Sequence, residues 1–137
     1  MPPVLALRRA GVTVFAGNDD IRDSWWPYGD ADVLQRVMLI GYRSGLYTDD
    51  ELVLAFSFAT DNAACALGLS NYGLRIGASA DLVALPARHV PEAVVARPRD
   101  RTVFKAGRIV ALQGRYGLTA IPDIRQIRSR GDRRAEL

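Results

Sequence analysis

One short stretch of the chain gathers the side chains best suited to bind a metal and a flat ligand. Three carboxylates fall within five positions, and three aromatic residues follow them closely: Asp19, Asp20, Asp23, Trp25, Trp26 and Tyr28. A carboxylate is a hard oxygen ligand for zinc, iron or manganese, and a bound metal makes hydroxide available near neutral pH. Aromatic side chains can stack against a planar ring. The stretch therefore indicates a site for a cation and a planar ligand.

The same side chains also have a purely structural interpretation, which stays open at this point. Aspartates that follow strands often cap a turn or the next helix, and tryptophans in loops often cover the edge of a core. Three clustered acids without histidines are a weak metal signal. The spacing does not match a calcium-binding EF-hand loop, because the glycine and the final glutamate of that loop are missing.

The residues ahead of this stretch are expected to place it at the edge of a parallel sheet. Residues 4–10 show helical spacing of apolar side chains, and Gly11 follows where a helix would stop. Residues 12–16 form a nearly continuous apolar run, which is typical of a strand buried on both faces. Loops after such strands lie at the carboxyl ends of the sheet, where α/β folds place their chemistry.

Three helices are predicted after the loop, over residues 31–44, 49–59 and 63–69. Thr48 and Glu51 have the spacing of a capping box at the start of the second helix. Beyond Gly77 the period changes, and three short strands are predicted within residues 80–86 and 102–111. A tight turn at residues 106–107 joins the last two strands. A short helix between residues 90 and 95 stays an open alternative, and no structure is assigned after Leu112.

Composition is ordinary for one folded domain, with 137 residues, 49% apolar and 24% charged. No apolar run reaches the roughly 18 residues that cross a bilayer, and the start lacks the pattern of a secretory signal. We therefore expect no membrane association and a cytoplasmic location. The single cysteine, Cys65, lies in an alanine-rich apolar run and is expected to be a small buried side chain.

The positive charge lies at the end of the chain. From Arg115 onward there are six arginines and three acids, and their difference equals the net charge of +3 of the whole chain. A tail of mixed sign with one nearby aromatic residue does not favour a nucleic-acid partner.

The loop resembles a known family. The segment GNDDIRDSWWPYG, with PPVLALRRAGVTVFA ahead of it, is similar to the last barrel strand and following loop of bacterial cytosine deaminases and their relatives in the metal-dependent amidohydrolase superfamily. The resemblance continues through ADVLQRVMLIGYRSG, NAACALGL, YGLRIGASADLVALPA and RTVFKAGRIVA. It covers roughly residues 2–112, which is nearly all of the chain outside the tail.

The resemblance implies an α/β fold that is the C-terminal portion of a (β/α)8 barrel with strands of an accessory β-sandwich. Residues 1–76 would hold the last barrel strand and its flanking helices, and residues 77–112 the sandwich strands. Residues 113–137 would form a basic, disordered tail. One barrel strand cannot close a barrel, so residues 12–16 would have two unpaired edges.

The resemblance also assigns roles in the loop. Asp19 would bind the metal, zinc or iron, and accept a proton from the attacking water as ammonia leaves the ring. Asp20 would support the substrate pocket, and Trp25 would form part of its wall. Ser24 stands where relatives usually have proline, a minor change in loop stiffness.

Most of the metal ligands of that family have no counterpart in the sequence. The only histidine, His89, lies outside the positions of the family's site, and we expect it to be structural or exposed. The chain is therefore expected to be a fragment of a metal-dependent hydrolase of carbon–nitrogen bonds that deaminates cytosine or a related cyclic amidine. We expect it to bind no metal and to be inactive alone.

A non-catalytic interaction module is the alternative. In that hypothesis the chain self-associates as a homo-oligomer, or it completes a split barrel with a separate N-terminal chain. The residues present do not distinguish one nucleobase-like ring from another, nor zinc from iron.

Overall fold

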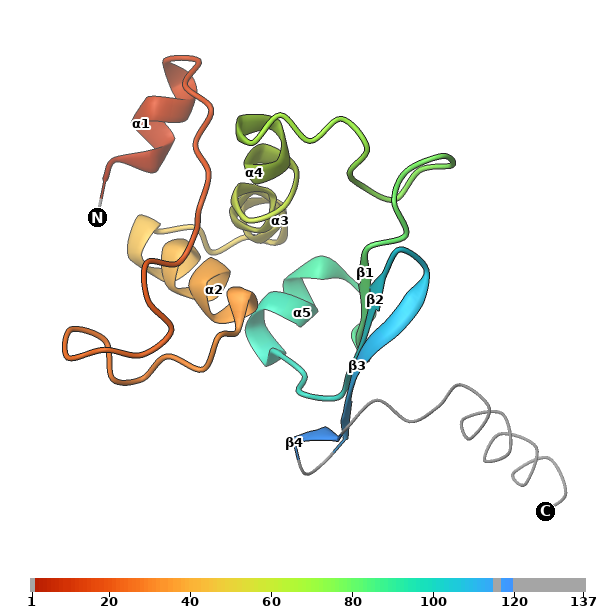
Figure 1. Cartoon of the computed structure of the whole chain (residues 1–137). Helices are drawn as coiled ribbons and strands as arrows, with labels where there is room; N and C mark the ends of the chain where they lie inside the picture. Colours follow the sequence, from red (N-terminus) through yellow and green to blue (C-terminus); the bar gives the residue numbers. More distant parts are fainter. Residues whose placement is uncertain (1, 115–116, 120–137) are drawn as a thin grey trace, which may run out of the picture. The chain divides into compact units, whose positions relative to one another are not determined.

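The computed structural model describes residues 2–114 and 117–119 of the chain. The chain divides into two units, Met1–Ala78 with Ala87–Pro98, and Ser79–Pro86 with Arg99–Leu137. The first unit is helical and the second is a small sheet (Figure 1). None of the described helices is long and apolar enough to span a bilayer.

The core of the first unit is formed by helices that pack on one another. The helices are α1 (Val4–Arg9), α2 (Val33–Ser44), α3 (Asp49–Phe58), α4 (Asp61–Ala66) and α5 (Val90–Ala96). Helix α3 contacts α2, α4 and α5, and α2 also contacts α5. The largest fully buried side chains are those of Phe58, Leu46, Val37 and Val94. Burial of apolar surface at these positions is the main force that holds the helices together.

Local capping explains where α2 and α3 begin. Asp32 accepts a hydrogen bond from the Leu34 amide at 3.0 Å, so α2 begins at Val33 rather than at residue 31 as predicted. The capping box predicted for Thr48 and Glu51 is confirmed. The backbone amides of Thr48 and Tyr47 both donate to the Glu51 carboxylate, and they lower the pKa of that carboxyl.

Helix α5, which the sequence left open, is present; it begins at Val90 and is capped by His89. The Nδ1 atom of His89 accepts a hydrogen bond from the Glu92 amide at 3.2 Å. The Glu92 carboxylate turns back to the Arg88 amide and guanidinium, at 2.9 and 3.0 Å. His89 is therefore exposed and has a structural role, as expected from the sequence.

The second unit is an antiparallel sheet of order β1-β2-β3-β4. Its strands are β1 (Leu82–Ala84), β2 (Arg101–Lys105), β3 (Arg108–Gly114) and β4 (Gly117–Thr119). The predicted turn at Ala106 and Gly107 is confirmed, and both residues have positive φ, 48° and 75°. Asp81 holds this turn, because its carboxylate accepts from the Ala106 amide at 2.7 Å and pairs with the Lys105 ammonium. These contacts lower the pKa of Asp81, the Lys105 contact most of all.

The expected strand at residues 12–16 is wrong for the described structure. The segment is extended but belongs to no sheet, and its apolar side chains are open: Val12 is 48% and Phe15 is 54% exposed. Three hydrogen bonds tie it to the helices: from the Val12 amide to the Leu7 carbonyl (3.0 Å), from the Ala16 amide to the Phe58 carbonyl (2.8 Å), and from the Asn62 side chain to the Val14 carbonyl (2.9 Å). A strand buries both faces only within a sheet that is covered on each side, and the described residues place no strand beside this run.

Two further expectations need correction. Cys65 is exposed rather than buried. Helix α4 ends at Ala66, three residues before the predicted end, because Gly68 takes a left-handed φ of 69°. The buried position of this short helix is Ala64 instead, so the alanine-rich run buries only one side.

Ordered structure continues beyond Leu112, where the sequence predicted that it ends. Strand β3 reaches Gly114, and Leu112 pairs with Thr119 of β4. Antiparallel pairing across a short connection supplies the backbone hydrogen bonds that no local pattern predicted. The rest of the predicted tail, residues 115–116 and 120–137, lies outside the described residues.

Two neighbouring valines in α5 test the packing of the first unit. Val94 is fully buried and Val95 is 63% exposed. We expect Val94→Ala to lower the free energy of unfolding by about 2 kcal/mol, because two buried methyl groups are lost. Val95→Ala should change it by less than about 0.5 kcal/mol. Urea denaturation followed by circular dichroism measures both, and equal losses would contradict the packing of α5.

Candidate functional site

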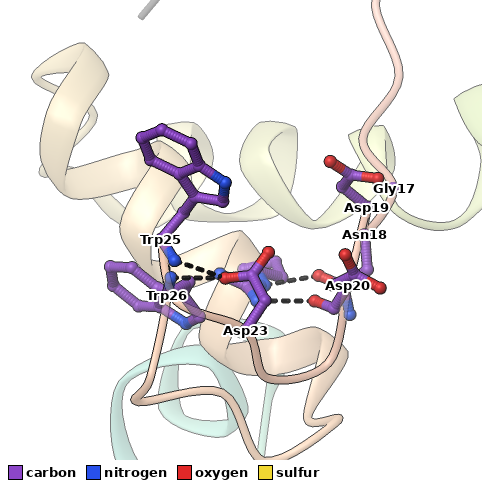
Figure 2. A pocket seen from close by; sticks show the side chains of 8 residues that line it. Gly17, Asn18, Asp19, Asp20, Asp23, Trp25 and Trp26 are labelled. Atoms are coloured by element: carbon purple, nitrogen blue, oxygen red, sulfur yellow. Dashed lines mark hydrogen bonds between the residues drawn. The ribbon is translucent and has the colours of Figure 1, made fainter.

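The predicted site residues line one pocket in the first unit. The pocket has a volume of about 290 Å³. Its lining residues are Gly17, Asn18, Asp19, Asp20, Asp23, Trp25, Trp26 and Arg36. Figure 2 shows Asp19 and Asp20 on one side, the two tryptophans on the other, and Asp23 between them. The structure therefore brings Asp19, Asp20 and Trp25 together, although none of them lies in a helix or strand.

Asp23 has the structural role that the sequence left open as an alternative. One of its carboxylate oxygens accepts hydrogen bonds from the amides of Trp25 (2.8 Å) and Trp26 (2.6 Å). Its own amide donates to the Trp26 carbonyl at 3.4 Å. This is an aspartate that closes a turn, and its charge is satisfied by backbone donors.

The loop returns closely upon itself after this turn. A Cβ atom on Gly29 would lie 1.5 Å from the carbonyl oxygen of Ile21, so only glycine fits at this position. The Arg22 guanidinium donates to the Pro27 carbonyl at 2.7 Å and closes the same loop from the other side. Residues 21–29 thus form a closed segment that presents the tryptophans.

The two tryptophans have different environments. Trp25 is 90% exposed, so its indole is free to meet a ligand or another surface. Trp26 is half-buried, lies edge-on to Tyr28 with ring centroids 5.8 Å apart, and has the Arg36 guanidinium 5.1 Å from its ring centroid. The pocket wall next to α2 is therefore set by Trp26, while Trp25 projects from the loop.

Arg36 is the pocket residue that the sequence analysis missed. Its Nε donates to the Asn18 side-chain oxygen, and its Nη2 lies 3.5 Å from the Asp20 carbonyl oxygen. In the sequence it is one polar position in an amphipathic helix. Its position in the first turn of α2, directly after the loop, is the one signal that could have directed attention to it.

The acids of the pocket do not form a metal site by themselves. Within residues 2–114 and 117–119, no group of three histidine, cysteine, aspartate or glutamate side chains is placed to hold an ion. Asp23 is committed to backbone amides, whereas the carboxylates of Asp19 and Asp20 are exposed and make no hydrogen bond with described residues. Zinc and iron sites need three or four ligands, so these two carboxylates do not fit a metal without donors from elsewhere.

Comparison with known proteins identifies the family. The sequence matches the Amidohydrolase family over residues 1–111. The chain belongs to the amidohydrolase family. The superfamily resemblance of the loop is thereby confirmed.

Two curated relatives share this region. N-isopropylammelide isopropyl amidohydrolase of Pseudomonas sp. (strain ADP) is 35% identical over 109 residues, which are 79% of this chain and 27% of the relative. Pterin deaminase of Rhizobium rhizogenes (strain K84 / ATCC BAA-868) is 30% identical over 122 residues, 88% of this chain and 26% of the relative. The chain thus spans about a quarter of the length of these two amidohydrolase relatives.

Two solved structures are similar to the chain in fold and in sequence. N-isopropylammelide isopropylaminohydrolase from Burkholderia multivorans ATCC 17616 has a TM-score of 0.78 and 49% identity, covering 87% of this chain and 30% of that one. The 5-methylcytosine deaminase from Klebsiella pneumoniae with phosphonocytosine has a TM-score of 0.73 and 32% identity, covering 88% and 29%. The chain is similar both to an N-isopropylammelide isopropylaminohydrolase and to a 5-methylcytosine deaminase. These similarities support the family, but they do not assign the chain to the cytosine deaminases within it.

Two glycines of the loop provide a matched test of its closure. Gly29→Ala places a methyl group on the Ile21 carbonyl, so we expect the free energy of unfolding to fall by about 1–3 kcal/mol and tryptophan fluorescence to change. At Gly17 no atom lies within 4 Å of an added Cβ, so Gly17→Ala should change stability by less than about 0.5 kcal/mol. Urea denaturation followed by fluorescence distinguishes them, and a harmless Gly29→Ala would contradict the close approach.

Proposed function

We propose that this chain contributes one part of the active site of a metal-dependent hydrolase that acts on a carbon–nitrogen bond of a nitrogen-containing ring. The observation that carries the proposal is the match to the Amidohydrolase family over residues 1–111, which includes the whole pocket around Asp19. The portion of a (β/α)8 barrel expected from the sequence belongs to the same proposal. Residues 12–16 are extended but unpaired within the described residues, and they would become its last strand only if further strands lay beside them.

Asp19 is the proposed catalytic and metal-binding residue. Its carboxylate is exposed and makes no hydrogen bond with the described residues, so it can accept a proton or coordinate a metal ion. Asp23 is unsuitable for this task because its carboxylate already closes the turn. Among the acids of the pocket, Asp19 and Asp20 therefore remain for chemistry, and we assign proton transfer to Asp19.

Asp20 and Trp25 are the proposed substrate-binding residues. A ring that carries amino or keto groups offers hydrogen-bonding edges to a carboxylate and flat faces to an indole. The indole of Trp25 is 90% exposed and can therefore cover such a ring without first leaving a packed site. The proposed substrate class is a cyclic amidine such as cytosine, in agreement with relatives named for N-isopropylammelide, pterin and 5-methylcytosine.

The remaining metal ligands must come from residues outside this sequence in the proposal. When bound, zinc or iron would supply a nucleophile derived from water at neutral pH. The described residues do not hold the ion alone, so this chain's own contribution is limited to Asp19 and the walls of the pocket. The donors can belong to a complementing N-terminal chain that packs against residues 12–16.

A second candidate function, self-association through residues 12–16, is favoured by the exposure of that segment. Val12 and Phe15 are both about half exposed, and the amides of residues 13–15 make no hydrogen bond with described residues. An extended segment with open amides and apolar side chains is a template for pairing with another chain. A homo-oligomer would cover the same edge that a complementing chain would cover.

Complementation tests the catalytic proposal. We expect the 137-residue chain alone to show no turnover of cytosine or N-isopropylammelide with added zinc or iron. Mixing it with the remainder of the Burkholderia relative, whose matched portion is 30% of its length, should restore activity. Asp19→Asn should lower that activity by about 10²- to 10⁴-fold, because the proton acceptor is lost.

Asp50→Asn is the control for that experiment, because Asp50 is an exposed acid in the first turn of α3, outside the pocket. It should leave the restored rate unchanged. Turnover by the chain alone, or restored activity that does not depend on Asp19, would refute the proposed role of Asp19. Failure of the two chains to associate would refute the complementing-chain form.

Sedimentation velocity tests the second candidate. If residues 12–16 pair between copies, Phe15→Ser should shift the chain from oligomer to monomer, since an apolar contact is replaced by a polar side chain. Tyr42→Ser serves as control, because Tyr42 is 70% exposed on α2. If the chain without substitutions sediments as a monomer, the self-association hypothesis is wrong.

A further inference from the structure

The carboxylate of Asp19 depends on its chain neighbours for its position. No hydrogen bond within the described residues involves this side chain, and the backbone from Gly17 to Asp20 belongs to no helix or strand. The last backbone anchor before it is the hydrogen bond from the Ala16 amide to Phe58. Whatever fixes Asn18 and Asp20 therefore fixes Asp19 between them.

Arg36 makes these connections. Its Nε donates to the Asn18 side-chain oxygen, directly before Asp19, and its Nη2 lies 3.5 Å from the carbonyl oxygen of Asp20, directly after it. One guanidinium group thus contacts the residues on both sides of Asp19. The fork of an arginine can reach two oxygens at once, whereas a lysine ammonium is a point charge on a flexible stem.

The guanidinium itself is held on both sides. Arg36 lies in the first turn of α2. The backbone there is fixed by the next residue, Val37, which is fully buried in the helical core. On the other side, the Trp26 ring lies 5.1 Å from the guanidinium carbon, within the range of a cation–π contact. Through Trp26 the same side chain also reaches the turn that Asp23 closes. The helix is thereby joined to both parts of the loop.

We infer that Arg36 is a positioning residue that sets the place of the Asp19 carboxylate by bridging Asn18 and Asp20 against the face of Trp26. The inference rests on the proposed function of Asp19 and extends it to a residue outside the acid-rich loop. Arg36 need not touch substrate in this role. Reactions that depend on geometry lose about 100-fold in rate when a reacting group is displaced by about 1 Å, so the bridge has a kinetic consequence.

Nuclear magnetic resonance on the 137-residue chain gives a test that does not require activity. In Arg36→Gln we expect altered amide shifts and lower order parameters at residues 17–20, with α3 and α5 unchanged. Arg36→Lys should give an intermediate result, because it keeps the charge and loses the fork. Arg43→Gln is the matched control, since Arg43 is an exposed arginine on the same helix, outside the pocket.

Activity of the complemented enzyme supplies the second readout. Arg36→Gln should lower kcat about 10- to 100-fold and leave KM within about threefold, since a displaced Asp19 affects proton transfer more than binding. Arg43→Gln should change neither. A merely stabilising residue would lower the active fraction in proportion to unfolding, and the kcat of Arg36→Gln would then recover at low temperature.

The outcomes separate this inference from the proposed function. Unchanged shifts and order at residues 17–20 in Arg36→Gln would overturn the bridge, whatever the activity. A loosened loop with an unaltered kcat would overturn the positioning role. If even the unaltered chain yields no complemented activity, the proposed function fails, while the resonance comparison still decides whether Arg36 holds the loop.

Discussion

The hydrogen bond between the Ala16 amide and the Phe58 carbonyl joins the core of the first unit to its candidate site. Phe58 is fully buried at the end of α3, so the packing around its ring also fixes the position of its carbonyl group. The bond is 2.8 Å long and lies three residues before Asp19. Because no other hydrogen bond between described residues joins residues 15–16 to the helices, the position at which the loop starts depends on this contact.

From that anchor the loop is shaped by polar contacts and by one close return of the backbone. Asp23 closes a turn, Gly29 permits a close return of the backbone, and Arg36 connects the loop to α2. The contacts of Asp23 and Arg36 satisfy polar groups that would otherwise need water. The acids of the pocket differ accordingly: Asp23 accepts from backbone amides and is structural, whereas the carboxylates of Asp19 and Asp20 make no hydrogen bond with the described residues.

The apolar surface of the extended segment is the other consequence of this arrangement. Residues 12–16 have the composition of a strand with two buried faces, yet Val12 and Phe15 are about half exposed. The chain spans about a quarter to a third of its amidohydrolase relatives, and this segment has the composition expected where further strands would pack. Any strand that packed against residues 12–16 would therefore lie next to the loop that forms the pocket, because the loop begins at Gly17.

Local signals in the sequence determined the elements whose cause is local. The capping box at Thr48, the turn at Ala106–Gly107 and the helical periods of α2 and α3 depend on neighbours within a few residues, and all are present. The family could likewise be read from the motif around Asp19, because motif spacing is a property of the chain alone. The pocket's acidic and aromatic residues were found for the same reason.

Tertiary structure decided what depends on contacts across the chain. Residues 12–16 and Cys65 read as buried, but burial needs neighbours that the described fold does not place beside them. The β3–β4 pairing beyond Leu112 and the role of Arg36, which is 18 positions from Asn18, likewise arise from approach in space. The closed geometry of the loop decides that Asp23 accepts from backbone amides, while the carboxylates of Asp19 and Asp20 make no hydrogen bond with described residues. Residue types and spacing do not encode this geometry.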